Sequence, residues 1–233
     1  MKIKAVLDDI IRRTHNVKSY RFSRPSSFEY VAGQYMIIFL PNGNEGLLKK
    51  PLTISSSPTE DFIEVTKKLT PGHEFSDAMT SINVGDELEI DAPYGQFVLK
   101  ENKNKIAMLS GGIGITPFRS MCRYSTDSNL DTNIVIFYGN KTSKDIVFKQ
   151  EFEQMENENK NFKIVNTLTR QGSNWDGHTG HINANLIKEE LPDYPQRLFY
   201  LCGPPRMMNT MQDLLQELDI SKEKIMVEKF PTN

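Results

Sequence analysis

The stretch Ser110-Gly111-Gly112-Ile113-Gly114-Ile115-Thr116-Pro117 decides the fold of the second half of this chain. The apolar run Ile106–Leu109 before it predicts a buried strand, and the residues from Pro117 to about Tyr124 predict a helix. Glycines permit a tight turn and close approach of a ligand, and proline suits the first helical turn. The helix N-terminus offers N–H groups to a diphosphate. The spacing departs from G-x-G-x-x-G, so a tight structural turn is the alternative interpretation.

Strands and helices continue to alternate through the rest of this half. Apolar runs predict the strands, and the segments between them carry helical patterns. The predicted strands are Ile134–Tyr138, Phe162–Leu168, Leu198–Leu201 and Lys224–Val227, and the predicted helices are Phe148–Met155 and Pro205–Leu218. Strands that alternate with helices indicate a parallel sheet that is covered on both faces. We therefore expect an α/β parallel-sheet domain.

The first half reads as many short strands with one helix. Alternating polar and apolar residues, or short apolar runs bounded by turn residues, predict the strands. The predicted strands are Ile3–Leu7, Val17–Phe22, Tyr35–Leu40, Leu52–Ser56, Phe62–Leu69 and Glu87–Ile90, and the helix runs from His73 or Glu74 to Ile82. Such spacing is typical of a β-barrel or sandwich. The charged stretch Lys100–Lys105 marks the boundary, which gives two domains, residues 1–101 and 102–233.

Composition excludes several classes of protein. The chain has 233 residues, of which 38% are hydrophobic and 25% charged, with a net charge of −2, so no basic field points to nucleic acid. No apolar run reaches the length of a membrane span, and the first residues do not resemble a signal peptide. Two cysteines, Cys122 and Cys202, are too few for a four-cysteine iron–sulfur or zinc site. We expect a cytoplasmic protein that holds no metal and binds neither nucleic acid nor membrane.

Cys202-Gly203-Pro204-Pro205 follows the predicted strand Leu198–Leu201 at its carboxyl end. Ligands of open α/β sheets bind at the carboxyl ends of the strands. A buried cysteine is also a common small core residue. On this segment alone, a ligand-binding role and a packing role both remain open.

In order and spacing, these segments resemble the ferredoxin–NADP reductase superfamily over nearly the whole chain. Members pair a flavin-binding antiparallel β-barrel with a nicotinamide-nucleotide domain. The Arg-x-Tyr-Ser/Thr signature of that family corresponds to Lys50-Pro51-Leu52-Thr53 here. The resemblance implies that Lys50 neutralises the diphosphate of FAD and that Thr53 forms a hydrogen bond near flavin N5. Leu52 stands where an aromatic residue usually stacks on the flavin.

Further segments match the family in the expected order. Pro71–Ser76 resembles a second phosphate segment, where backbone N–H groups and the Ser76 hydroxyl would meet the diphosphate. The glycine loop resembles the cradle of the nicotinamide nucleotide, and Glu228-Lys229-Phe230 resembles the terminal acidic-x-aromatic motif. The resemblance implies the catalytic residues Thr53, Cys202 and Glu228, and the cofactor-binding residues Lys50, Pro51, Leu52, Thr53, Gly72, Phe75, Ser76, Gly111, Gly112, Gly114, Thr116, Thr169, Arg170, Cys202, Gly203, Pro204 and Phe230.

Thr169 and Arg170 follow the predicted strand Phe162–Leu168. By resemblance, members that prefer the phosphorylated nucleotide carry a hydroxyl and an arginine here for the 2′-phosphate, whereas NAD-binding sites more often carry an acidic residue. The pair favours NADPH. Trp175-x-Gly177-x-x-Gly180 resembles a loop of NADH-using members, so NADH stays open as the alternative.

The resemblance implies an NAD(P)H-dependent flavin oxidoreductase, in which hydride passes from NAD(P)H to bound FAD. Electrons then leave for a separate acceptor: a ferredoxin, a flavodoxin, an oxygenase component or free flavin. Lys49, Lys50, Lys67 and Lys68 are a candidate basic rim for an acidic partner. The alternative is a non-catalytic nucleotide-sensing or structural module of the same fold, which the replacement of the signature arginine and tyrosine by Lys50 and Leu52 favours.

Overall fold

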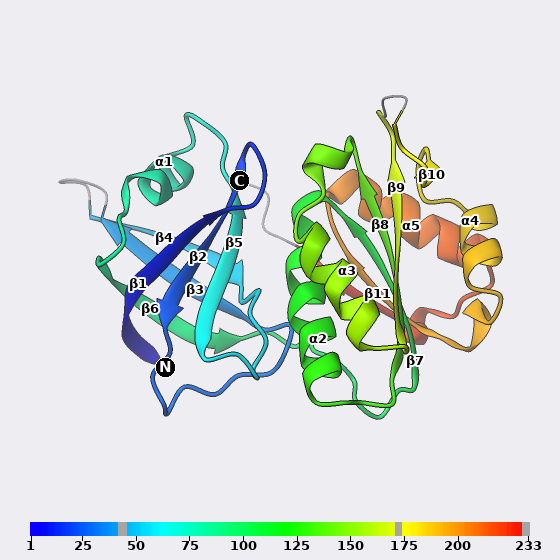
Figure 1. The fold of residues 1–233 in the computed structure, drawn as a ribbon, viewed down its shortest axis with the longest axis horizontal. Coiled ribbons are helices and arrows are strands. Elements are labelled where there is room, and N and C mark those ends of the chain that lie inside the picture. The colour runs from blue at the N-terminus through cyan, green and yellow to red at the C-terminus, as the bar shows by residue number, and fades with distance from the viewer. Residues whose placement is uncertain (42–45, 171–173, 230–233) are drawn as a thin grey trace.

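The computed structural model describes residues 1–41, 46–170 and 174–229, and it contains two six-stranded sheets in two domains that lie side by side (Figure 1). The first domain has strands β1 Lys2–Arg12, β2 Val17–Ser23, β3 Tyr35–Pro41, β4 Leu47–Thr53, β5 Phe62–Lys68 and β6 Glu87–Tyr94, with helix α1 Glu74–Ser81. The predicted two-domain fold, with an antiparallel first domain and a parallel second domain, is confirmed.

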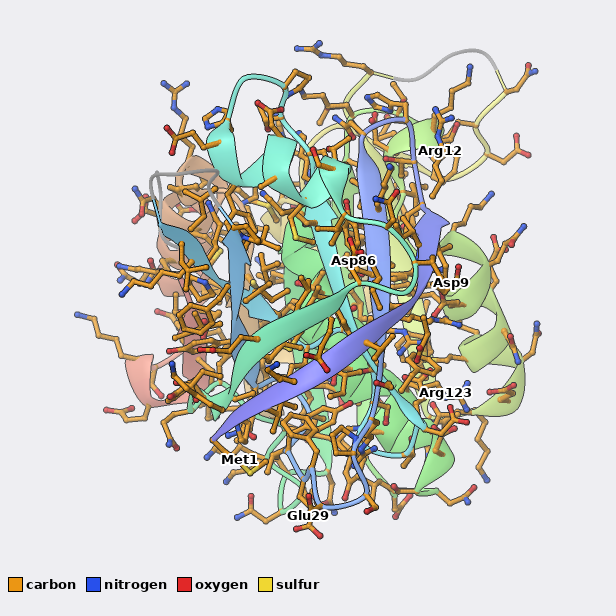
Figure 2. All side chains as sticks on the ribbon, turned by 90° about the vertical axis from the view of Figure 1, so that its left-hand side faces the viewer. Met1, Asp9, Arg12, Glu29, Asp86 and Arg123 are labelled. Atoms are coloured by element: carbon orange, nitrogen blue, oxygen red, sulfur yellow. The ribbon has the colours of Figure 1, made fainter. Side chains whose placement is uncertain are left out.

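The first domain is an antiparallel barrel. Its strands follow the order β4-β3-β6-β1-β2-β5, and an isolated bridge between Ile54 and Val65 joins the two edges of the sheet. Alternate residues of each strand point inward, as in β3, where Met36, Ile38 and Leu40 are fully buried. Figure 2 shows β1 crossing the outside of this barrel from Met1 to Arg12. Helix α1 packs against β3 and β4.

One predicted strand of this domain is wrong in its position. The sequence predicted Leu52–Ser56, whereas β4 runs from Leu47 to Thr53. After Thr53 the carbonyls of Ser55 and Ser56 accept hydrogen bonds from Arg119 and Ser120 of the other domain. The apolar and hydroxyl pattern after Thr53 therefore reflects burial against a helix rather than a continued strand.

The second domain holds strands β7 Lys105–Gly111, β8 Asn133–Asn140, β9 Phe162–Leu168, β10 His178–Thr179, β11 Leu198–Cys202 and β12 Ile225–Glu228. All neighbouring strands pair in parallel, in the order β10-β9-β8-β7-β11-β12. The helices are α2 Thr116–Asp127, α3 Lys149–Glu158, α4 Ala184–Glu190 and α5 Pro205–Glu217, with short 3-10 turns at Gly112–Ile115, Ser143–Asp145, Tyr194–Gln196 and Lys222–Lys224. The prediction missed α4, whose N-terminus is capped by the Asn183 side chain.

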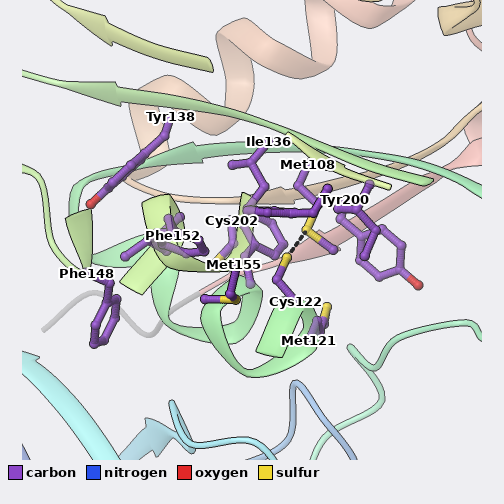
Figure 3. Packing of buried hydrophobic residues seen from close by; sticks show 14 of the residues in the cluster. Met108, Met121, Cys122, Ile136, Tyr138, Phe148, Phe152, Met155, Tyr200 and Cys202 are labelled. Carbon is purple, nitrogen blue, oxygen red and sulfur yellow. Dashed lines mark hydrogen bonds between the residues drawn. The ribbon is translucent and has the colours of Figure 1, made fainter. Parts of the chain in front are cut away.

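Helices cover both faces of the parallel sheet. Helices α2 and α3 lie on the face toward the barrel, and α4 and α5 lie on the opposite face (Figure 1). Each face has its own cluster of buried apolar residues. The cluster under α2 and α3 contains both cysteines, with Cys122 Sγ 3.9 Å from Met108 Sδ (Figure 3). In the described part of the chain, no helix is both long and apolar enough to span a membrane.

Candidate active site

A pocket of about 460 Å³ opens in the first domain between β4, β5 and the start of α1. Lys50 of β4 and Lys67 of β5 line it together, and the Lys67 ammonium lies 5.8 Å from the centre of the Phe75 ring. Burial, and then the charge of Lys50, lower the pKa of Lys67 to about 8. The two ammonium groups repel each other in this partly buried pocket, and a bound anion would reduce that repulsion. The pocket therefore favours a polyanionic ligand such as a diphosphate.

The segment before α1 supplies the rest of this pocket. Gly72 and Ser76 both line it, and Gly72 has a φ of +79°, a backbone conformation that favours glycine. The Ser76 N–H already donates to the His73 carbonyl at 2.8 Å, and His73 provides no side-chain cap to the helix. The start of α1 thus presents its remaining N–H groups at the pocket wall, where they complement a phosphate.

The glycine loop of the second domain folds as a 3-10 turn over Gly112–Ile115 that leads directly into α2. A Cβ atom at Gly114 would lie 2.3 Å from the Cys202 carbonyl oxygen, and one at Gly111 would lie 2.3 Å from Met207 Sδ. Tyr138 donates its hydroxyl to the Gly112 carbonyl at 2.8 Å. The loop is therefore packed tightly on the turn between β11 and α5, and at Gly114, whose neighbours are backbone atoms, only glycine fits without a shift of the backbone.

Cys202 and Glu228 lie side by side at the carboxyl end of the parallel sheet. Cys202 of β11 pairs in register with Ser110 of β7 and with Glu228 of β12. Burial and the charge of Glu228 raise the pKa of the Cys202 thiol well above its ordinary value, and burial raises the pKa of Glu228. The thiol is neutral at physiological pH, which suits a residue that shapes a pocket rather than a nucleophile. Phe230 lies outside the described residues.

The two halves of the predicted site meet where the domains touch. Thr53, at the end of β4, is buried, and two residues later Ser55 accepts a hydrogen bond from Arg119 Nη1 at 3.1 Å. Arg119 lies on α2, which starts at Thr116 immediately after the glycine loop. The 3-10 turn Gly112–Ile115 also contacts β5. The segment that follows Thr53 and the glycine loop therefore border one interface between the domains.

The segment predicted to select the nucleotide lies at the carboxyl ends of β8 and β9. Thr169 N–H donates to the Asn140 carbonyl at 3.0 Å, and Arg170 N–H donates to the Lys141 carbonyl at 2.7 Å. These bonds place Lys141 and Arg170 on adjacent loops at the edge of the sheet that also carries Gly111. Two exposed or half-exposed cations at this edge are compatible with a phosphate group on the nucleotide ribose.

Sequence reasoning missed two features of the site. It assigned Lys67 to a surface rim, whereas the structure places Lys67 in the pocket with Lys50. It also missed the charged residues that join the domains around Arg119. Alternation along β5 gives a weak indication of which way Lys67 points, but no local pattern marks Arg119, because its partners lie far away in the sequence.

Two family models match most of the chain. The oxidoreductase FAD-binding domain matches residues 4–99, and the oxidoreductase NAD-binding domain matches residues 108–213. The chain belongs to the ferredoxin–NADP reductase superfamily. The pocket with Lys50, Lys67 and the uncapped start of α1 fits the diphosphate of FAD, which this superfamily uses.

The names of similar proteins point to different electron acceptors. The chain is 31% identical to the glycine betaine monooxygenase reductase subunit of Pseudomonas aeruginosa over 89% of this chain and 58% of that protein. It is 28% identical to NADH-cytochrome b5 reductase 2 of Aspergillus terreus over 94% and 76% of the two chains. A ferredoxin NADP+ reductase from Neisseria gonorrhoeae, solved with bound FAD and NADP, has the same fold, with a TM-score of 0.82, 20% identity, and coverage of 97% and 98%.

Proposed function

We propose that this chain is an NAD(P)H-dependent flavin oxidoreductase that passes hydride to bound FAD and then delivers electrons to a separate acceptor. The observation that carries the proposal is the contact between the glycine-loop turn of the second domain and β5, the strand whose Lys67 lines the cationic pocket of the first domain. The domain models of an FAD-binding and an NAD-binding oxidoreductase support it. The chain spans 58% of the length of the Pseudomonas relative, so the acceptor and the activity of any larger protein belong to the proposal.

Bound FAD would supply the redox chemistry, because it takes up hydride from the nicotinamide and releases electrons singly or in pairs. The chain itself binds and orients the reactants. Lys50 and Lys67 would hold the diphosphate, and Thr53 would form a hydrogen bond near flavin N5. The loop Gly111–Thr116 holds the nucleotide, while Cys202 and Glu228 shape the nicotinamide pocket. Lys50, Lys67 and the loop Gly111–Thr116 would therefore determine the affinity for FAD and for the nucleotide. Thr53, Cys202 and Glu228 would align the reacting rings.

The visible absorption spectrum tests the proposed function. The purified protein, supplied with FAD and freed of excess, is expected to be yellow and to bleach when NADPH or NADH is added without oxygen. A colourless protein that takes up no FAD would contradict the proposal and favour the non-catalytic module. A yellow protein that neither nucleotide bleaches would show a flavoprotein of another kind.

The acceptor is expected to be a separate redox protein or a small molecule: a ferredoxin, a flavodoxin, an oxygenase component or free flavin. The name of the Pseudomonas relative favours an oxygenase component. Steady-state reduction of each of these acceptors by the loaded protein would rank them. Rapid reduction of free flavin with none of the protein acceptors reduced would identify free flavin as the acceptor and exclude the three proteins.

NADPH is the proposed preferred nucleotide, because a backbone hydrogen bond joins Arg170 to Lys141 at the edge of the sheet and Thr169 directly precedes Arg170. Arg170→Ala is expected to raise the KM for NADPH about 10-fold, the loss of one charge-assisted contact to a phosphate. The KM for NADH should change less than about twofold. Flavin reduction measured against the concentration of each nucleotide checks this, and equal effects on both nucleotides would exclude a 2′-phosphate contact.

Cys202→Ala and Thr53→Ala are expected to slow flavin reduction at saturating nucleotide by roughly 10-fold, because both residues align the reactants. The FAD content should stay at the parent level, since neither residue lines the cationic pocket. Stopped-flow absorbance and flavin quantification measure the two quantities. A Cys202→Ala protein that is reduced at the parent rate would remove Cys202 from the proposed site.

A further inference from the structure

Six charged side chains form a closed ionic cluster where the two domains meet. The cluster consists of Arg13, Arg21, Glu60 and Glu64 from the first domain and Arg119 and Glu151 from the second. Three positive and three negative groups balance one another. Glu64 is fully buried, and the Arg119 side chain is only 4% exposed.

Arg119 is the residue of the second domain that reaches furthest across the interface. Its guanidinium donates to both carboxylate oxygens of Glu60, with Nη2 to Oε1 at 2.8 Å, and Nη1 also donates to the Ser55 carbonyl at 3.1 Å. Its Nε donates to Glu151 Oε2 at 2.9 Å. Burial would lower the pKa of Arg119, but the bond to Glu60 and the charges of Glu151, Glu60 and Glu64 raise it. The guanidinium thus joins both domains with all of its donor groups.

Arg13 makes the reverse crossing, from the first domain to the second. Its Nη1 donates to Glu151 Oε1 at 2.5 Å, and its Nη2 donates to Glu64 Oε2 at 2.9 Å. Glu64 also accepts from Arg21 Nε at 2.9 Å. Burial would raise the pKa of Glu64, but the charges of Arg119, Arg13 and Arg21 hold it below its usual range. Glu64 and Glu151 are therefore each shared by two arginines.

An aromatic ring gives the cluster a flat support. Phe148 points out of the core of the second domain toward the strands of the barrel (Figure 3). The guanidinium carbons of Arg13 and Arg119 lie 4.8 Å and 5.9 Å from the centre of its ring. Guanidinium groups that are bound by carboxylates and packed on one ring have little freedom to tilt. These contacts therefore restrict the orientation of one domain relative to the other.

The cluster connects directly to both halves of the candidate site. Ser55, which accepts from Arg119, lies two residues after Thr53, and Arg119 lies three residues after Thr116, the end of the glycine loop. Ser120, beside it, donates to the Ser56 carbonyl at 2.5 Å. These hydrogen bonds must therefore break before one domain can rotate against the other and move the glycine loop away from the segment that follows Thr53.

On the basis of the proposed function, we infer that Arg119 is a positioning residue for hydride transfer: by bonding Glu60, Glu151 and the Ser55 carbonyl, it fixes the nucleotide loop against the flavin segment. Hydride leaves C4 of the nicotinamide with its electron pair and bonds to flavin N5, so the nucleotide is oxidised and the flavin reduced. A buried ion pair adds little net stability compared with apolar packing, so orientation is the property that this cluster provides.

The test compares Arg119→Met and Glu60→Gln with a matched control, Arg123→Met. Arg123 lies one turn further along α2 and is ion-paired within the second domain to Asp127 and Glu158. With protein loaded with FAD, Arg119→Met and Glu60→Gln are expected to slow flavin reduction at saturating nucleotide by about 10- to 100-fold. The nucleotide Kd should stay within about twofold of the parent value, because the loop itself is intact. Arg123→Met should leave both quantities at the parent level.

A second readout does not depend on activity. Hydrogen exchange of the FAD-free proteins is expected to speed up at residues 54–57, which contain the carbonyls bonded by Arg119 and Ser120, in Arg119→Met and Glu60→Gln. It is expected to stay unchanged at these residues in Arg123→Met. If hydrogen exchange speeds up in Arg119→Met and Glu60→Gln but their flavin is reduced at the parent rate, the positioning role is refuted. It is also refuted if both the exchange rate and the reduction rate stay at the parent values. A parent protein that takes up no FAD, or whose flavin no nucleotide reduces, would instead overturn the proposed function. If Arg119→Met does not fold, the same two measurements on Glu60→Gln decide whether the positioning role is correct.

Discussion

Replacement of both Lys50 and Lys67 by methionine is expected to weaken FAD binding on the order of 1,000-fold, because two charge-assisted contacts to the diphosphate disappear. Both lysines line the one pocket that also contains Gly72 and Ser76. Methionine keeps an unbranched side chain that is one atom shorter than lysine, and it removes the charge. Fluorescence titration of FAD into the flavin-free protein measures the Kd.

Lys68→Met is the matched control for this change, since Lys68 is the exposed neighbour of Lys67 on β5. It is expected to leave the Kd for FAD within about twofold of the parent value. If the double variant binds FAD as tightly as Lys68→Met, the pocket is not the diphosphate site.

The depressed pKa of Lys67 also predicts how FAD binding depends on pH. Burial and the charge of Lys50 lower this pKa to about 8, and an anion in the pocket should raise it again. The protein must then take up a proton on binding FAD, so the Kd is expected to rise as the pH increases above about 8. Lys67→Arg should flatten this pH dependence, since a guanidinium stays protonated. A Kd that is independent of pH in the parent protein would contradict the argument.

The sign of the linkage is opposite for the stability of the flavin-free protein. In the flavin-free protein, the folded state holds fewer protons on Lys67 than the unfolded state between pH 8 and 10.5. The contribution of Lys67 to stability should therefore increase with pH over that interval, and bound FAD should abolish the increase. Urea unfolding of the flavin-free and loaded proteins, each compared with Lys67→Met, checks both signs.

Gly114→Ala is expected to have the second large effect, a rise of about 100-fold in the Kd for the nucleotide. The added Cβ would lie 2.3 Å from the Cys202 carbonyl oxygen and 2.6 Å from the Gly203 Cα. Both contacts are with backbone atoms, so either the loop or the end of β11 must move. Nucleotide titration of the loaded protein, followed by flavin absorbance, measures the change.

Gly112→Asn provides the control for the glycine loop. A Cβ atom there meets nothing within 4 Å, and its φ of +52° is one that asparagine tolerates. The variant is expected to bind nucleotide within about threefold of the parent. FAD content reports whether the barrel of Gly114→Ala is still folded. Tight nucleotide binding by a folded Gly114→Ala protein would show that the contact between Gly114 and Cys202 is not needed.

The amino-acid sequence determined the two-domain architecture and most of its elements. Period-two alternation in β1 and β2, the apolar runs of β7, β8 and β9, and the glycine loop before α2 are all set by interactions between residues close in the chain. The same local patterns placed Cys202 at the carboxyl end of a strand and Gly114 in the turn before a helix. Thr53 was expected inside the predicted strand Leu52–Ser56 and was singled out by the family resemblance. The strand at Leu47–Thr53 was misplaced, because its lysines face a pocket and its neighbour Ser55 is buried by a helix of the other domain.

Only the tertiary structure decided which charges belong together. Lys50 and Lys67 lie on the two edge strands of the barrel, and closure of the barrel brings them into one pocket. Arg119 reaches Glu60 and Ser55, more than fifty residues earlier, only after the two domains dock. The spacing of apolar residues along an element predicts which face is buried, whereas the spacing of charged residues does not predict which residues form ion pairs. The pairing of opposite charges is therefore fixed by the packing of the domains, which the sequence encodes only through all of its contacts at once.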